Sequence, residues 1–286
     1  MNNCVSDSSP DEPIILARPA GGFAGPPLAR AIPVPVLPPP EFPFVDMPRR
    51  LAFWDAACAL ALWLAYAFLI FCSGVAFLLS TSWPPLGFLS VNVLLGVFAL
   101  FIVLGVIRFR RQSVASLGLN RPDAARLILG TILAVPAAYA ASTAANLLYM
   151  SLLSGGFDAL LEERSELFAM MPELSFGTIV VFSLFVGFHE EVFFRGFLLT
   201  RLTVGLRSRA AAVAVTSVIF GLLHAYQGPA GILQTTFLGA VLGIVVCVTR
   251  TLWPAILAHA FFNIVGLVLM PWLAELSEEL PAAAGG

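Results

Sequence analysis

The chain has 286 residues, of which 59% are hydrophobic and 11% are charged, and its formal net charge is -2. A mean hydropathy of +0.93 excludes a soluble domain and predicts a multi-pass membrane protein. Neither sign of charge dominates, so no nucleic-acid partner is predicted.

The first 48 residues differ in composition from the rest of the chain. They contain twelve of the 21 prolines and too few periodic apolar positions to build a core. This composition is typical of a disordered, partly polyproline II segment. We therefore predict a disordered Pro-rich tail over residues 1–48, a transmembrane helical domain over residues 49–275, and a short flexible tail over residues 276–286.

From residue 53 onward, apolar segments recur that are long enough to cross about 30 Å of hydrocarbon. Helices are expected, because an isolated strand cannot satisfy its backbone groups in lipid. The predicted fold class is all-α, a polytopic membrane bundle of about seven helices. The sequence is also compatible with eight helices, because the apolar segments can be divided differently at the Trp83-Pro84-Pro85 turn or at Pro136. The expected spans cover about 53–80, 87–107, 127–153, 176–200, 210–226, 230–249 and 253–273.

The arginines predict the orientation of the bundle. Eleven of them flank the spans on one side, whereas the other side carries Arg164 within an acidic segment, 158–173, that is expected to be a solvated face. The positive-inside rule then places the Pro-rich tail in the cytoplasm and the C-terminus outside. The absence of lysine and of a targeting signal favours a bacterial source, and hence the bacterial inner membrane.

Two adjacent glutamates, Glu190 and Glu191, lie in one of the most apolar stretches of the chain. An ionisable side chain near the centre of a membrane helix costs on the order of 2.5 to 3.5 kcal/mol, so the pair indicates an intramembrane function. Glu191 precedes Arg195 by four residues, which is the favourable order for an ion pair. Glu190 points about 100° away and is free to face another neighbour. His189 is expected to be a structural hydrogen-bonding residue between helices.

Two further polar patterns, Phe220-x-x-x-His224 and His259-x-x-x-Asn263, occur in later spans. At about 1.5 Å per residue from the nearest cytoplasmic arginines, Glu190, His224 and His259 all lie between about 13 and 22 Å deep. We therefore expect them to meet at one level. Phe220 lies one turn before His224 and is expected to form an apolar wall for its ring. Gly239 and Gly243 form a small-x-x-x-small pattern that predicts close helix packing.

These residue types suit the hydrolysis of a peptide bond within the membrane. Glu190 can act as a general base on water, with His224 orienting that water or donating to the leaving group. The N–H groups of His259 and Asn263, on one helix face, can form an oxyanion hole.

Glu190-Glu191-x-x-x-Arg195, Phe220-x-x-x-His224 and His259-x-x-x-Asn263, in this order and on separate spans, resemble the three signature motifs of the CPBP family. That family includes the type II CAAX prenyl endopeptidases and the bacteriocin-processing or self-immunity proteins. The resemblance covers about residues 175–270. It implies a glutamic intramembrane endopeptidase without a cofactor, acting on a membrane-embedded or lipid-anchored protein or peptide. The implied catalytic residues are Glu190, His224, His259 and Asn263, supported by Glu191, Arg195 and Phe220.

Three alternatives stay open at this point. Glu190, His224 and His259 can be arranged as a zinc triad, which would make the protease metal-dependent. The same scaffold can serve as a catalytically silent immunity or regulatory protein. A proton-coupled transporter would also use membrane carboxylates and histidines, although the sequence contains neither paired broken helices nor an internal repeat.

Overall fold

The computed structural model describes residues 42, 45–72, 84–152, 156–169 and 172–284. These residues form helices and short connections, without a strand, which confirms the predicted all-α class. Most of the Pro-rich segment, predicted to be disordered, lies outside the described residues. The helices are α1 (Arg49–Cys72), α3 (Pro84–Phe109), η1 (Val114–Leu117), α4 (Ala124–Leu152), α5 (Gly156–Ala169), α6 (Phe176–Glu191), η2 (Val192–Leu199), α7 (Thr200–Leu206), α8 (Arg209–Leu222), η3 (Ala225–Gln227), α9 (Gly228–Thr249) and α10 (Trp253–Ala284).

Each predicted span coincides with helical residues in the described part of the chain. Five helical segments there are long and apolar enough to cross a membrane: Arg49–Cys72, Leu89–Phe109, Ala124–Leu152, Phe176–Leu206 and Ala225–Thr249. These segments confirm a polytopic membrane bundle. The part of the first predicted span beyond residue 72 lies outside the described residues. Helix α10 continues to Ala284, so the boundary predicted at residue 275 is not a helix end.

The predicted span over residues 210–226 is too long. Helix α8 has 14 residues and ends at Leu222, which gives it a length of about 21 Å, less than the hydrocarbon thickness. The chain then passes through His224 and the single turn η3, and α9 begins at Gly228, whose φ of 78° is left-handed. The turn between α8 and α9 therefore falls within the predicted span, and His224 lies on that turn.

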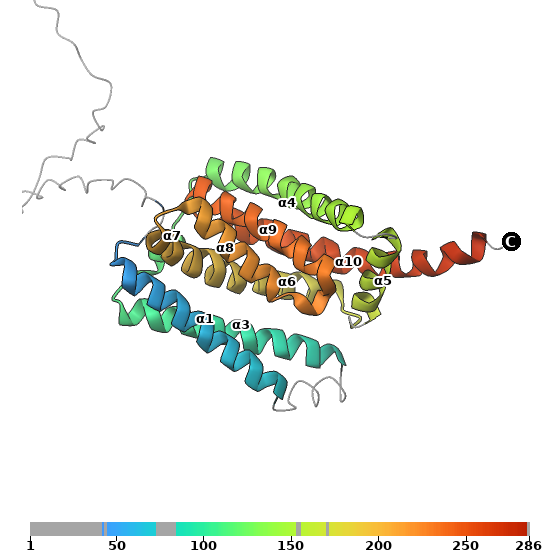
Figure 1. Ribbon diagram of the computed structural model, residues 1–286, viewed down its shortest axis with the longest axis horizontal. Helices are drawn as coiled ribbons and strands as arrows, with labels where there is room; N and C mark the ends of the chain where they lie inside the picture. The colour runs from blue at the N-terminus through green and yellow to red at the C-terminus, as the bar shows by residue number, and fades with distance from the viewer. Residues whose placement is uncertain (1–41, 43–44, 73–83, 153–155, 170–171, 285–286) are drawn as a thin grey trace, which may run out of the picture. The chain divides into compact units, whose positions relative to one another are not determined.

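The helices pack around the segment that contains the two glutamates (Figure 1). Helix α9 contacts both α8 and α4, and α10 contacts both α6 and α4. Helices α1 and α3 pack on each other and reach the remaining helices through α7 and α6. The predicted packing role of Gly239 and Gly243 is confirmed, because a Cβ at either position would lie 3.3 Å from an atom of α8.

Polar contacts at one end of the bundle join α1 and α7 to the segment that follows α3. Arg110 donates from Nη2 to Oδ1 of the buried Asp55 at 2.6 Å. The fully buried Arg201 donates to Oε1 of Gln112 at 2.6 Å, and its guanidinium carbon lies 4.0 Å from the centre of the Phe197 ring. These contacts hold the helix pair α1–α3 against the segment that follows Glu190.

Helix α5 is an integral part of the bundle, although its sequence suggested a solvated acidic segment. Glu163 accepts hydrogen bonds from the Tyr149 hydroxyl of α4 and, at 2.9 Å, from the backbone N–H of Ala230 in α9. Arg164 donates to the side-chain oxygens of Asn146 in α4 and Gln234 in α9. Because Glu163 satisfies one of the free N–H groups at the start of α9, it stabilises the turn that contains His224.

Replacement of Glu163 by alanine is expected to destabilise this end of the bundle. It removes the acceptor for the Ala230 N–H and the Tyr149 hydroxyl, and loss of such a helix cap costs about 1 kcal/mol. The apparent melting temperature in detergent should fall by about 2 to 4 °C. Glu162→Ala is the matched control, because Glu162 is an exposed residue of the same helix. Equal melting temperatures for the two variants would contradict the assigned role of Glu163.

Candidate active site

Glu190 and Glu191 are the last residues of α6 and lie where the helical geometry changes. The next eight residues, Val192–Leu199, form the π-helical segment η2, and all eight are buried. Such segments are rare and occur frequently at functional sites. The wider turn starts directly after the two glutamates and includes Arg195. No feature of the sequence indicated this change of helix type.

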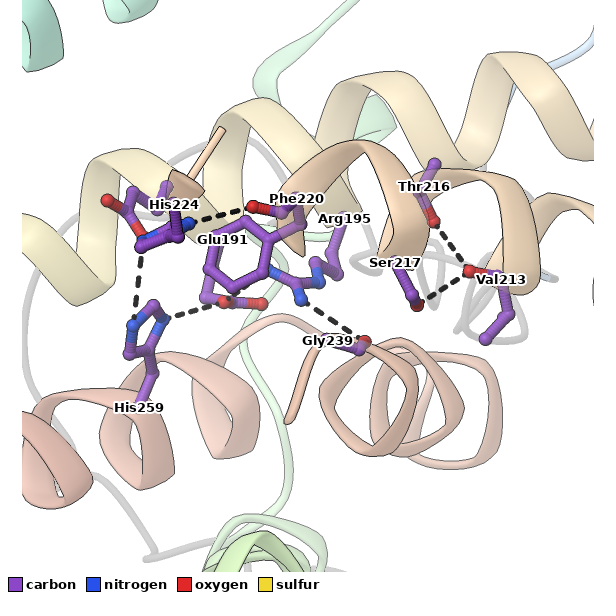
Figure 2. A network of polar contacts seen from close by, with 10 residues as sticks. Glu191, Arg195, Val213, Thr216, Ser217, Phe220, His224, Gly239 and His259 are labelled. Atoms are coloured by element: carbon purple, nitrogen blue, oxygen red, sulfur yellow. Dashed lines mark hydrogen bonds and ion pairs between the residues drawn. The ribbon is translucent and has the colours of Figure 1, made fainter. Parts of the chain in front are cut away.

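Glu191 is the anchor of a fully buried polar network. Its Oε1 atom accepts a hydrogen bond from Nη1 of Arg195 at 2.8 Å, which confirms the predicted ion pair. The same oxygen lies 2.8 Å from Nδ1 of His259 in α10. Nη2 of Arg195 also donates to the backbone carbonyl of Gly239 in α9 at 3.1 Å (Figure 2). The guanidinium carbon of Arg195 lies 4.4 Å from the centre of the Phe220 ring of α8. One carboxylate and one guanidinium thus connect α6, η2, α8, α9 and α10.

This network fixes the tautomer of His259. Glu191, held by Arg195, is a carboxylate and can only accept, so Nδ1 of His259 must carry a proton. The other ring nitrogen, Nε2, faces Glu190 with 3.7 Å between it and Oε2 of that residue. The imidazole of His259 therefore spans both glutamates. A separation of 3.7 Å is too long for a direct hydrogen bond, and one water can contact both atoms.

His224 lies directly after α8, on the turn that precedes α9. Its Nδ1 atom is 2.7 Å from the backbone carbonyl of Phe220, and its ring centre is 4.6 Å from that of Phe220 (Figure 2). The predicted apolar wall is confirmed. Since a carbonyl only accepts, Nδ1 carries the proton and Nε2 of the neutral ring is an acceptor. His224 is therefore suited to orient a water molecule.

Glu190 and His224 line one cavity of about 80 Å³. This exceeds the roughly 10 to 15 Å³ of such volume that one water needs. Oε2 of Glu190 is buried and has no hydrogen-bond partner among the described residues. A carboxylate oxygen in this state is ready to accept a hydrogen bond from a bound molecule. The cavity is lined by Trp63, Asn92, Leu95, Ala99, His189, Glu190, Phe193, Phe194, Leu223, His224 and Tyr226.

The structure thus brings together Glu190, His224 and His259 from three separate helical segments. Asn263 lies one turn beyond His259 in α10, half-buried, and does not line the cavity in this structure. His189 was expected to bond between helices, but its Nδ1 instead bonds to the carbonyl of Phe185 within α6.

The sequence did not identify several cavity residues. Trp63, Asn92 and Tyr226 line the cavity from α1, α3 and η3. They come from distant parts of the chain, so no local spacing could have grouped them. His189 also lines the cavity, and its position next to Glu190 in the sequence was an indication of this.

The alternative zinc triad can be tested against the positions of its donors. Among the residues that the structure describes, no three His, Cys, Asp or Glu side chains form a group that could hold a metal ion. Glu190, His224 and His259 are not such a group in this structure, and zinc dependence stays a hypothesis that a chelator experiment decides.

Removal of Arg195 should destabilise the protein strongly. In Arg195→Met the carboxylate of Glu191 stays buried without its cation, and breaking a buried pair in this way costs about 3 to 5 kcal/mol. The double variant Glu191→Leu/Arg195→Met should recover much of this loss in thermal stability, because neither charge remains buried. Nδ1 of His259 loses its acceptor in this variant, so the position of the ring should be less well fixed.

Arg207→Met serves as the control for this pair of variants, because Arg207 is exposed and lies in the same stretch of chain. Melting temperatures in detergent give the comparison. A double variant no more stable than Arg195→Met would contradict the assignment of Glu191 and Arg195 as a mutually dependent buried pair.

Comparison with protein-family models gave a match over residues 172–265 to the type II CAAX prenyl endopeptidase Rce1-like family. Comparisons with curated proteins and with solved structures gave no match. The matched segment is about a third of the chain and contains all three motifs described above. It confirms the resemblance that these motifs indicated. Residues 172–265 are therefore similar to a CAAX protease-like domain, which supports the resemblance to the CPBP family of intramembrane proteases.

Proposed function

We propose that this protein is a glutamic intramembrane endopeptidase that uses Glu190 to activate water. The observation that carries the proposal is the buried Oε2 of Glu190, which has no hydrogen-bond partner among the described residues and lies 3.7 Å from Nε2 of His259. Oε2 of Glu191 is likewise unpaired, but Glu191 does not line the cavity, so Glu190 is the glutamate that can contact a water bound there. The match to a family of endopeptidases supports the same reaction class.

In the first step, Glu190 takes a proton from a water molecule bound in the cavity. The acceptor atom Nε2 of His224 holds the second proton of the same water and directs its oxygen lone pair toward the substrate carbonyl carbon. The water oxygen then forms a bond with that carbon, and the carbonyl oxygen becomes an oxyanion. This assigns His224 an orienting role, because its own N–H is bonded to the Phe220 carbonyl.

The oxyanion needs donors, and we assign these to His259 and Asn263. Nδ1–H of His259 is bonded to Glu191, so the ring can donate to the oxyanion only from Nε2, when that nitrogen carries a proton. The amide of Asn263, one turn further along α10, supplies the second donor after a change of side-chain rotamer or on substrate binding. Each such donor is typically worth about 3 to 4 kcal/mol in the transition state.

In the last step, the carboxylic acid of Glu190 returns its proton to the peptide nitrogen. The C–N bond breaks, and the products are a free carboxyl group and a free amine. Every proton is accounted for by Glu190 and water. We therefore propose that no metal cofactor takes part.

The substrate is proposed to be a membrane-embedded or lipid-anchored protein or peptide in the lipid bilayer. Several cavity residues belong to helices apolar enough to cross a membrane, which supports a substrate within or bound to the bilayer. We further propose a bacterial inner membrane location with the N-terminus in the cytoplasm, on the distribution of arginines. In a bacterium, maturation or immunity peptides are more suitable substrates than prenylated CAAX proteins.

The direct test is cleavage of candidate membrane peptides by the purified protein in detergent, with wild type, Glu190→Gln and His224→Ala compared. Glu190→Gln preserves shape and removes the base, so its kcat should fall by at least about 100-fold. His224→Ala should also be strongly impaired. Each sample is measured with and without a zinc chelator, and Glu162→Ala reports on an exposed carboxylate.

Wild-type activity that withstands the chelator and disappears in Glu190→Gln is the expected result. Activity that the chelator abolishes and zinc restores would revive the metal-dependent alternative. Full activity of Glu190→Gln would contradict the proposed base. Absence of cleavage in every sample, despite correct folding, would favour the silent immunity or regulatory protein.

A further inference from the structure

His189 is the histidine that the proposed chemistry leaves unused. It precedes Glu190 directly, is 7% exposed, and lines the same cavity as Glu190 and His224. A histidine that serves only to join helices would have its polar atoms directed at another helix. The bond of His189 is instead made within α6, to the carbonyl of Phe185 at 3.0 Å.

This bond determines which ring nitrogen is available in the cavity. The Phe185 carbonyl can only accept, so Nδ1 of His189 carries the hydrogen. In the neutral ring, Nε2 then has a lone pair and acts as an acceptor. Two neighbours hold the ring in place: the Phe185 ring, with 4.9 Å between centres, and Gly96 of α3, where a Cβ would come within 2.8 Å of the imidazole.

His189 and His224 line the cavity from different elements. His189 lies in α6 and packs against Gly96 of α3, whereas His224 lies on the turn after α8. A substrate peptide bound against Glu190 also passes His189, because the two residues are neighbours in α6 and line the same cavity. An N–H without an acceptor is costly in a site surrounded by hydrocarbon.

We propose that Nε2 of His189 accepts a hydrogen bond from a backbone N–H of the substrate next to the scissile bond. His189 is then a substrate-binding residue that sets the position of the peptide over Glu190. The assignment rests on the endopeptidase function proposed above. It accounts for the fixed tautomer, for the place of His189 in the cavity lining and for the glycine that leaves room for the ring on α3.

Two substitutions separate this role from a structural one. In His189→Asn the side-chain amide can still donate to the Phe185 carbonyl, but the acceptor at the position of Nε2 is lost. KM should rise about 3- to 10-fold with kcat little changed, since one neutral hydrogen bond to the bound substrate disappears. His189→Gln can place its carbonyl oxygen near the position of Nε2 and should recover part of the affinity. Wild-type KM in His189→Asn would overturn the proposal, and so would a fall in kcat at unchanged KM.

A second pair of variants tests the orientation of the ring without changing it chemically. Gly96→Ala should displace the imidazole and raise KM in the same way as His189→Asn. Gly105→Ala is the matched control, because it lies in the same helix and a Cβ there meets no atom within 4 Å. An equal KM for Gly96→Ala and Gly105→Ala, with both folded as judged by melting temperature, would count against the proposal.

A substrate series identifies the hydrogen bond itself. In each member one backbone N–H near the scissile bond is replaced by an ester oxygen. For one member, wild type and His189→Asn should have the same KM, because the donor is already absent. If His189→Asn weakens every member equally, His189 does not bind a backbone N–H.

Glu190→Gln, measured with the same peptides, keeps the two proposals distinguishable. If it still cleaves them, Glu190 is not the base, and the KM of His189→Asn against wild type tests the His189 assignment by itself. If Glu190→Gln is inactive and His189→Asn has wild-type KM, the endopeptidase proposal stands and the role of His189 alone is wrong.

Discussion

The buried carboxylate of Glu191 is the interaction on which the candidate site depends. Its charge is balanced by Arg195 at 2.8 Å, and the same oxygen receives the N–H of His259. Because both groups are buried away from water, removing one partner leaves an uncompensated charge. The pair also reaches α9 through the Gly239 carbonyl and α8 through the Phe220 ring. The two adjacent glutamates thus have different environments: Glu191 holds the helices together, and Glu190 faces the cavity.

Much of this arrangement could be predicted from the sequence, for physical reasons that apply within a membrane. The length of the apolar segments predicted the helical spans, and the i, i+4 spacing of Glu191 and Arg195 predicted their ion pair. The cost of charge in hydrocarbon drew attention to Glu190, His224 and His259. The short helix α8 was missed, because its end is set by the turn at His224 and Gly228 rather than by a loss of apolar residues. The π-helical turn after Glu191 was missed as well, since its sequence is as apolar as an ordinary membrane helix.

The contacts of α5 were also beyond prediction from composition. An acidic segment between two spans is usually solvated, yet Glu163 caps α9 and Arg164 bonds to two neighbouring helices. These bonds depend on partners about 15 to 70 residues away, Tyr149 and Gln234 among them, and no periodicity records such pairings. They have a consequence for the site, because they fix the start of α9 and hence the turn on which His224 lies. The site is therefore supported from one side by the Glu191–Arg195 pair and from another by α5.

The measurement that tests the central claim most directly is nitrogen NMR of the protein labelled with ¹⁵N at its histidine rings. The chain has three histidines, so three pairs of ring signals are expected, and single substitutions assign them. The anchored carboxylate of Glu191 requires a proton on Nδ1 of His259, and the carbonyls of Phe185 and Phe220 require the same of His189 and His224. A His259 ring protonated at Nε2 and bare at Nδ1 would contradict the account, because Glu191 could not then hold it beside Glu190.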